Sequence, residues 1–249
     1  MSQLVGKFVW FECVTKDPEK SKGFYGELFG WKVQSHPMPN GSYDMIALGE
    51  TPQGGYTKPE GKAPSHWTSY VSVEDVDATA KKVVSAGGKV LTPAFDVPQV
   101  GRMSQVADPQ GATFWIMRGE TDDAPDAPPA AGRFFWNELW ARDGKAAADF
   151  YEKVLGYEVK SMEMPDGAYH VLEKNGVPRA GVMTSPNKAV PPMWLPYVAV
   201  DGCDESVARA KKLGAEVHAP PTDIPDVGRF AVLGDPTGAA IAVIQPAKK

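Results

Sequence analysis

Apolar and polar positions change period along the chain in an order that predicts alternating strands and helices. Residues 8–14 alternate between the two classes, which is typical of a strand with one buried face. Residues 18–29 place apolar side chains at helical spacing, and Gly30 follows as a helix stop. After a hairpin the order returns as a strand over 67–73, a helix from Val76 to Ala86 ended by Gly87 and Gly88, and strands over 89–91, 102–107 and 112–118.

The same order repeats along the whole chain. FYGELFGW at 24–31 returns as FYEKVLGY at 150–157, with an offset of 126 (150 − 24 = 126). One inserted residue then shifts the offset, so that Trp67 matches Trp194 (194 − 67 = 127). A register kept over nearly the full length indicates two copies of one domain.

The halves are joined by a segment of different composition. Residues 119–131 are rich in Pro, Ala and Asp and have no apolar periodicity, which is typical of an extended linker. We therefore predict a first domain over 1–118, a linker over 119–131 and a second domain over 132–249.

A shorter spacing repeats inside the first half. Asp17 precedes Gly30 by 13 residues (30 − 17 = 13), and Asp75 precedes Gly88 by 13 (88 − 75 = 13). Both aspartates suit helix N-caps, where a carboxylate accepts an otherwise unpaired backbone N–H. The predicted fold is α+β, with two tandem domains, each of two βαβββ modules that form a curved, mainly antiparallel sheet with helices on its outer face.

Composition and charge limit the classes of binding partner that we expect. With 43% hydrophobic and 23% charged residues the chain has globular composition. The net charge of −5 and the scattered Lys and Arg residues argue against nucleic acid as a partner. No apolar run approaches the ~20 residues of a membrane span, and no signal peptide is evident, so we expect a soluble, cytoplasmic protein without a membrane partner. Cys13 and Cys203 occupy non-equivalent places and predict buried thiols without a redox role.

Three motifs occur in both halves, with Gly202 standing where the first half has Asp75. In the first half they are D-x6-FY-x3-FG (Asp17, Phe24, Tyr25, Phe29, Gly30), V-x-D-V-D (Val73, Asp75, Val76, Asp77) and D-P-x-G (Asp108, Pro109, Gly111). Together they resemble the glyoxalase/bleomycin-resistance/extradiol-dioxygenase superfamily, also called the vicinal oxygen chelate superfamily, as a tandem two-domain member. The resemblance covers nearly the whole chain and specifies a fold without identifying a reaction. Because two halves can imitate a homodimer of single-domain relatives, we expect a monomer with internal pseudo-symmetry or a weak homodimer.

The resemblance also implies where a divalent metal would be held. The expected ligands lie seven residues before each helix-capping Asp and four after the glycine of D-P-x-G. These positions are Trp10, Thr68 and Trp115 in the first half, and Trp136, Leu195 and Ala242 in the second. Since metal sites need several imidazole or carboxylate ligands, we expect no metal and no other cofactor.

The alternative is a cavity lined with aromatic side chains. The strand period of two puts Glu12 on the same face as Trp10, and both Glu138 and Trp140 on the same face as Trp136. Apolar walls with a few polar groups describe a typical small-molecule pocket. The predicted ligand-binding residues are Trp10, Thr68, Tyr70, Trp115, Trp136, Trp140, Tyr197, Tyr43, Tyr169, Arg102 and Arg229.

Two kinds of charged residue have both a functional and a structural interpretation. Glu12 and Glu138 lie within apolar strands, where a carboxylate is costly unless it is paired or used. Each either orients a ligand or acts as a general base, or else forms an ion pair across the sheet with Arg102 or Arg229. The two arginines either clamp an anionic ligand or hold the preceding VPxVG loop, and we favour the second role.

The leading hypothesis is a metal-independent protein that binds a small aromatic or amphipathic molecule, as in the bleomycin-resistance branch. The alternative is an enzyme, such as a lyase, an isomerase or a hydroxylase-like relative of glyoxalase. It would use Glu12 or Glu138 as its base, with or without a metal held by other ligands. A third hypothesis is a regulatory or immunity protein that acts on a partner.

Overall fold

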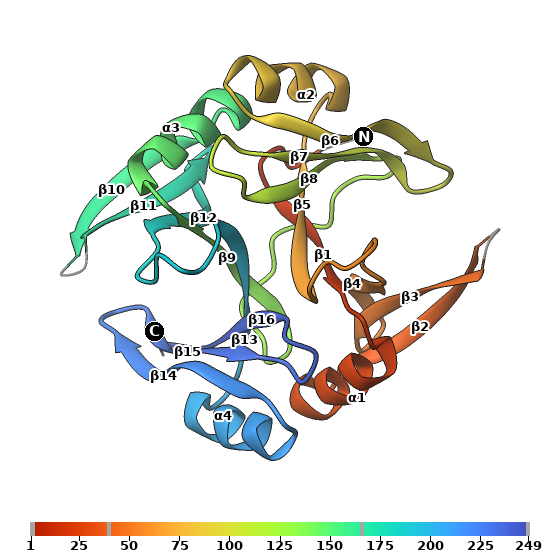
Figure 1. Cartoon of the computed structure of the whole chain (residues 1–249), viewed down its shortest axis with the longest axis vertical. Helices are drawn as coiled ribbons and strands as arrows, with labels where there is room; N and C mark the ends of the chain where they lie inside the picture. Colours follow the sequence, from red (N-terminus) through yellow and green to blue (C-terminus); the bar gives the residue numbers. More distant parts are fainter. Residues whose placement is uncertain (1–2, 39–40, 165–166, 248–249) are drawn as a thin grey trace. The chain divides into compact units, whose positions relative to one another are not determined.

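The computed structural model of the 249-residue chain describes residues 3–38, 41–164 and 167–247. In that part the predicted βαβββ order appears four times (Figure 1). Module 1 consists of β1 (Phe8–Val14), α1 (Pro18–Phe29), β2 (Lys32–Met38), β3 (Gly41–Leu48) and β4 (Thr51–Thr57). Module 2 consists of β5 (His66–Ser72), α2 (Val76–Ser85), β6 (Lys89–Val97), β7 (Gly101–Ala107) and β8 (Thr113–Gly119).

The second half repeats this order. Module 3 consists of β9 (Phe134–Ala141), α3 (Gly144–Leu155), β10 (Glu158–Met164), β11 (Gly167–Lys174) and β12 (Val177–Thr184). Module 4 consists of β13 (Met193–Ala199), α4 (Cys203–Lys212), β14 (Glu216–Ile224), β15 (Gly228–Gly234) and β16 (Ala240–Pro246). The element boundaries agree with the sequence predictions within a few residues, except that β6 is longer than the predicted strand over 89–91.

Each half forms one eight-stranded sheet. The strand orders are β2-β3-β4-β1-β5-β8-β7-β6 and β10-β11-β12-β9-β13-β16-β15-β14. Neighbours joined by hairpins are antiparallel, whereas β1 pairs with β4, and β5 with β8, in parallel. The predicted α+β fold of two tandem domains with two βαβββ modules each is therefore confirmed.

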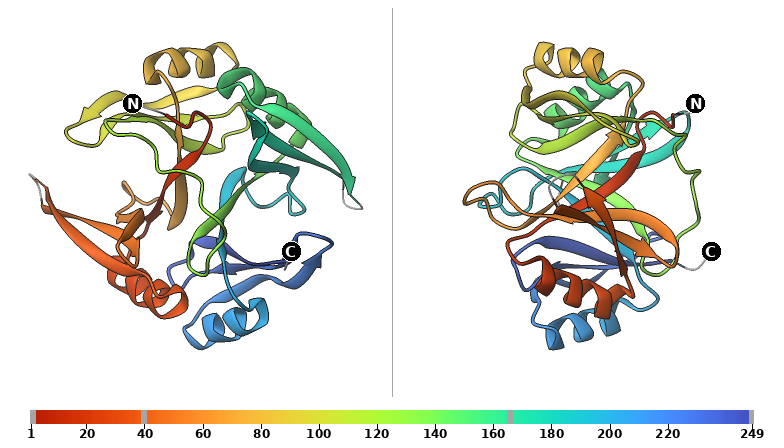
Figure 2. Two further views of the ribbon diagram at one scale, coloured as in Figure 1. Left: turned by 180° about the vertical axis from the view of Figure 1, so that it is seen from behind. Right: turned by 90° about the vertical axis from the view of Figure 1, so that its right-hand side faces the viewer.

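The two compact units of the structure do not coincide with the two halves of the sequence. The first compact unit comprises Met1–Val9, Thr68–Asp126 and Trp136–Trp194, so it contains most of modules 2 and 3. The second comprises Trp10–Trp67, Ala127–Phe135 and Leu195–Lys249, and contains most of modules 1 and 4. Within the first unit α2 and α3 lie side by side, as do α1 and α4 within the second (Figures 1 and 2). Each unit thus contains most of one module from each half. The domain boundaries predicted from the sequence repeat stay a prediction.

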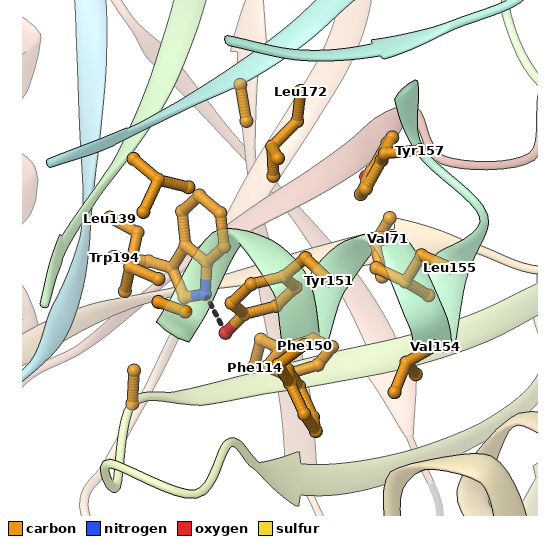
Figure 3. Packing of buried hydrophobic residues seen from close by; sticks show 14 of the residues in the cluster. Val71, Phe114, Leu139, Phe150, Tyr151, Val154, Leu155, Tyr157, Leu172 and Trp194 are labelled. Carbon is orange, nitrogen blue, oxygen red and sulfur yellow. Dashed lines mark hydrogen bonds between the residues drawn. The ribbon is translucent and has the colours of Figure 1, made fainter. Parts of the chain in front are cut away.

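The core of the first unit is built around Tyr151, the tyrosine of the FY motif in α3, which is fully buried. Trp194 Nε1 donates to the Tyr151 hydroxyl oxygen at 3.1 Å (Figure 3). That hydroxyl donates to Asp108 Oδ2 at 3.2 Å, and the ring of Phe114 lies 5.4 Å from the Tyr151 ring, centroid to centroid. The strand, the helix and the D-P-x-G turn are thereby fixed to one side chain.

Local signals set the helix ends. Asp17, Asp75 and Asp143 each accept a hydrogen bond from the backbone N–H three residues later, as expected for N-caps. Gly30 ends α1 in the left-handed conformation, with φ of 73°, which glycine adopts without steric cost. Gly202 is the N-cap residue of α4 and provides no side-chain cap.

The first part of the predicted linker is held by N-terminal residues and by side chains of β5 and β12. Asp123 Oδ2 accepts from the backbone N–H of Leu4 and from Ser72 Oγ, both at 2.6 Å. Asp126 binds Arg179 at 2.6 Å and Lys7 at 3.2 Å. Residues 122–130 have no regular secondary structure, and the acidic side chains of Asp123 and Asp126 hold this part of the chain against the first compact unit.

Among the described residues, no helix is both long and apolar enough to cross a membrane.

The difference between capped and uncapped helices gives a first prediction. Replacing Asp143 by Ala removes the bond to the Ala146 N–H and should lower the free energy of unfolding by about 1 kcal/mol, as measured by urea denaturation. Gly202→Asn should raise it by roughly a few tenths of a kcal/mol, because the extended backbone there (φ −144°, ψ 118°) suits an N-cap side chain. The Glu205 carboxylate must turn outward to make room. If both variants lost stability, or if both gained it, the assignment of the caps would be contradicted.

Candidate functional site

A buried carboxylate in module 1 is bound by a tyrosine that also accepts from a tryptophan. On β1, Cys13 faces the core beside Ser21 of α1, so Trp10 and Glu12 face the side away from the helix. Trp10 Nε1 donates to the Tyr43 hydroxyl oxygen at 2.9 Å, and that hydroxyl donates to Glu12 Oε1 at 2.9 Å. We call these three residues the first Trp–Tyr–Glu triad.

The triad depends on a glycine in the strand between its members. Tyr43 lies on β3, and β4 separates it from Glu12 on β1. Gly55 of β4 is the register partner of Glu12. A Cβ at Gly55 would lie 2.0 Å from the Tyr43 hydroxyl oxygen, which is far inside van der Waals contact. Gly55 therefore lets the phenol cross the strand to the carboxylate.

Module 3 contains the same arrangement. Trp136 Nε1 donates to the Tyr169 hydroxyl oxygen at 3.0 Å, and this hydroxyl donates to Glu138 Oε2 at 2.9 Å. A Cβ at Gly181, the register partner of Glu138, would lie 1.9 Å from the Tyr169 hydroxyl oxygen. These residues form the second Trp–Tyr–Glu triad.

The two triads differ in one neighbour. Trp140 Nε1 donates to Glu138 Oε1 at 2.8 Å, so tyrosine and indole donors bind different oxygens of this carboxylate. The first half has Val14 at the position of Trp140 (140 − 14 = 126). Glu138 therefore has a donor that the first triad cannot reproduce.

The environment keeps both phenols neutral. Burial raises the pKa of Tyr43 far above its ordinary value, and the negative charge of Glu12 raises it further. Burial and then Glu138 raise the pKa of Tyr169 in the same way, while the Trp136 N–H opposes the shift. At neutral pH each phenol is therefore a fixed hydrogen-bond donor to a carboxylate that is almost completely enclosed, since Glu12 and Glu138 are 8% and 7% exposed.

The positions that the family resemblance assigns to metal ligands do not suit a metal. Trp10 and Trp136 use their indole N–H groups as donors within the triads. Thr68, Leu195 and Ala242 are buried and offer at most one hydroxyl. Within residues 3–38, 41–164 and 167–247 no three His, Cys, Asp or Glu side chains cluster in a way that could hold an ion. The donor set therefore does not fit a divalent cation.

The other predicted aromatic residues gather in modules 2 and 4. The rings of Tyr70 and Trp115 are stacked, with centroids 5.3 Å apart and an interplanar angle of 4°. Phe95, which the sequence analysis missed, meets Trp115 edge-on at 6.2 Å. In module 4, Tyr197 lies 6.2 Å from Phe230.

The arginines of the VGR segments hold neighbouring elements together. Arg102 binds Asp77 of α2 at 2.7 Å and Asp96 of β6 at 2.9 Å. Arg229 binds Asp204 of α4 at 2.6 Å and Asp223 of β14 at 3.0 Å. These guanidinium groups bind aspartates of neighbouring elements, and their hydrogen-bonding capacity is largely used, which favours the structural role.

Comparisons with known proteins agree with this architecture. The family model described as Glyoxalase/Bleomycin resistance protein/Dioxygenase superfamily matches residues 7–116, and the Glyoxalase-like domain matches residues 127–244. The Mycobacterium tuberculosis protein named "Putative glyoxylase CFP32" is 41% identical, covering 96% of this chain and 94% of that protein. The Anthracycline biosynthesis protein DnrV of Streptomyces peucetius is 34% identical, with 96% and 93% covered.

Solved structures extend the comparison. The Mn(II)-bound glyoxalase from Novosphingobium aromaticivorans aligns with a TM-score of 0.69 and 15% identity, covering 97% of this chain and 82% of that chain. At this identity the likeness shows the fold alone.

The raised pKa values predict a pH dependence. Tyrosine in an unfolded chain titrates near pH ~10. Because the folded pKa values of Tyr43 and Tyr169 are higher, their neutral forms contribute their full stability below about pH 10 and lose it as the pH rises toward the folded values. Urea midpoints measured from neutral to alkaline pH should therefore fall less steeply in the Tyr43→Phe/Tyr169→Phe variant than in the unsubstituted protein.

At neutral pH the same variant should be less stable by about 1–3 kcal/mol per site, because each buried carboxylate loses a donor. Tyr56→Phe is the control. Burial also raises the pKa of Tyr56, yet its hydroxyl makes no hydrogen bond in the described part of the chain, so neutral-pH stability should be kept. A pH profile that is unchanged by Tyr43→Phe/Tyr169→Phe would rule out the assignment.

Proposed function

The chain belongs to the glyoxalase/bleomycin resistance protein/dioxygenase superfamily, and on that premise we propose that it binds a small aromatic or amphipathic molecule without a metal. The observation that carries the proposal is the duplicated Trp–Tyr–Glu triad. A repeat drifts where nothing constrains it, yet both copies keep a buried carboxylate, its tyrosine donor, the indole and the glycine between them.

The chemistry of the triads suits a ligand that has both a ring and a hydroxyl group. Half-buried indoles such as Trp10 and Trp136 offer flat apolar surface at low entropic cost. A carboxylate held in place by a phenol is a strong acceptor for a ligand hydroxyl. A few oriented polar groups among apolar walls are the usual composition of a small-molecule site.

The relatives support the class of ligand. One is named as an anthracycline biosynthesis protein and is similar over almost its full length. Anthracyclines contain a planar, hydroxylated ring system, and such a molecule would use both the indole faces and the carboxylate. Fold alone does not determine function, so the ligand class rests on the triads and on this relative.

Metal independence is a separate part of the proposal. It rests on the side chains at the expected ligand positions, of which Trp115 and Ala242 are examples. Protein purified without a nickel column should contain far less than one equivalent of divalent metal by elemental analysis, and EDTA should not change ligand affinity. One or two equivalents of Zn, Ni, Mn or Fe per chain would overturn it.

A second candidate function is catalysis by Glu12 or Glu138 as a general base. A buried carboxylate held 2.9 Å from a phenol favours it, because a positioned and desolvated base is effective in proton transfer. A relative named as a glyoxylase points the same way. In this case Glu→Gln variants would keep ligand binding and lose product formation, whereas a pure binder forms no product.

The binding test uses alizarin, a dihydroxyanthraquinone whose near-ultraviolet absorption overlaps tryptophan emission, so that a bound molecule quenches the fluorescence. Alizarin should quench saturably, and the Glu12→Gln/Glu138→Gln variant should bind it about tenfold more weakly or worse, since a charged acceptor is lost. Glu152→Gln is the matched control, because Glu152 is exposed on α3. Saturable binding with equal affinity in all three proteins would show that the triads are not the site.

A further inference from the structure

The side of module 2 away from α2 carries a cluster of aromatic rings. Phe114 and Ile116 of β8 point into the core with α2, so Trp115 between them points the other way. Trp115 pairs in register with Tyr70 of β5 on one side and with Gln105 of β7 on the other. Phe95 of β6 reaches the same face as the register partner of Met103. We call Tyr70, Trp115 and Phe95 the aromatic platform.

The geometry of the platform suits a stacked guest. The Tyr70 and Trp115 rings are stacked and nearly parallel, and Phe95 stands almost perpendicular to Trp115 at its edge, at 79°. Tyr70 is buried, at 6% exposed, so it supports Trp115, and the open part of the platform is formed by Trp115 and Phe95. Phe95 is 39% exposed and Trp115 is half-buried. Large aromatic side chains left partly exposed on a sheet face lose the favourable burial that a covering ring would restore.

A hydroxyl group on the same face has no partner. Thr68 precedes Tyr70 by two residues on β5 and so points to the same side. It is 2% exposed, and its Oγ1 forms no hydrogen bond within the described residues. Ser72, two residues beyond Tyr70, is satisfied by Asp123 at 2.6 Å. A buried hydroxyl without a partner costs free energy, and a polar atom of a ligand would remove that cost.

The second half does not repeat the platform. At an offset of 127, Thr68 corresponds to Leu195, Phe95 to Thr222 and Trp115 to Ala242. The hydroxyl and two of the three rings are therefore missing from module 4, although Tyr70 is kept as Tyr197. The triads are duplicated, whereas the platform occurs once.

We propose that the aromatic platform is the stacking site for one planar polycyclic ligand per chain, with an oxygen of the ligand bound to Thr68 Oγ1. This rests on the proposed function and narrows it to ligands with fused rings, such as hydroxylated quinones. A fused system covers Trp115 and meets the edge formed by Phe95, whereas a single ring covers only part of this surface. Since stacking and burial scale with the covered area, fused rings bind more tightly than one ring.

The experiment compares alizarin with catechol, which is its one-ring dihydroxy fragment, by fluorescence titration and calorimetry. The unsubstituted protein should bind one alizarin per chain at the tight site and prefer it to catechol. Trp115→Ala and Phe95→Thr, which copy the second half, should each weaken alizarin binding about tenfold or more and reduce the preference over catechol. Trp115→Phe should restore part of the affinity, which separates loss of stacking from loss of folding.

Leu91→Thr is the matched control, because Leu91 is also an exposed apolar residue of β6, at 47%, outside the ring cluster. Its affinity should be unchanged. Thr68→Val removes only the hydroxyl, and it should make the ligand-free protein more resistant to urea while weakening alizarin binding. A structural hydroxyl would change stability alone.

The outcomes separate this inference from the proposed function. If Glu12→Gln/Glu138→Gln weakens alizarin binding but Trp115→Ala and Phe95→Thr do not, the platform is wrong and the proposed function stands. Two equivalent alizarin sites per chain would also overturn the platform. If no saturable binding occurs up to the solubility limit of alizarin, both proposals fail.

Discussion

The interaction on which each compact unit depends is the hydrogen bond from a tryptophan indole to the buried tyrosine of the FY motif. In the first unit Trp194 donates to Tyr151, which donates onward to Asp108 of the D-P-x-G turn. In the second unit Trp67 donates to Tyr25 at 2.8 Å. Buried polar groups need hydrogen-bond partners, so the strand tryptophan fixes where each helix seats, and in the first unit the D-P-x-G turn also accepts from the phenol.

This constraint assigns opposite tasks to the two faces of each sheet. Residues that alternate toward the helix are committed to closing the core, and they repeat with little freedom between copies. Residues that alternate away from it, such as Glu12 and Trp10, contribute little to that closure. A carboxylate on this second face is retained only if something compensates for its desolvation, and the tyrosine of the triad is one such compensation. The triads therefore lie on the faces that the core does not need.

Much of the fold could be predicted from the sequence because its signals are local. Asp17 and Gly30 mark the ends of α1 with a cap and a left-handed residue, and the structure places them there. Strand β6 was predicted too short because two register shifts interrupt its period of two, and the second of them falls before Phe95. The same irregularity hid Phe95 as a member of an aromatic cluster.

The triads could be predicted only in part. The alternation on β1 places Trp10 beside Glu12, but Tyr43 lies two strands away on β3, and its approach depends on the absence of a side chain at Gly55 of the intervening β4. The sequence alone does not show which atom of another residue occupies the space that a Cβ would fill at a glycine. The equivalence of Gly55 and Gly181 at the repeat offset of 126 (181 − 55 = 126) is the signal that could have revealed it, because a duplicated glycine inside a strand indicates a close approach rather than a turn.

Comparison of the two copies shows which features depend on one another. Tyrosine, carboxylate, indole and glycine of the triad are kept as a set, since loss of any one leaves a buried group unpaired or overlapping. The rings of the platform have no such mutual requirement. The second copy has Ala242 in place of Trp115, because removing a half-buried ring leaves no buried polar group without a partner. It has Leu195 in place of Thr68, because this change removes an unpaired hydroxyl. In the first half the less stable choice is present at both positions, and a bound ring system is a physical reason for keeping it.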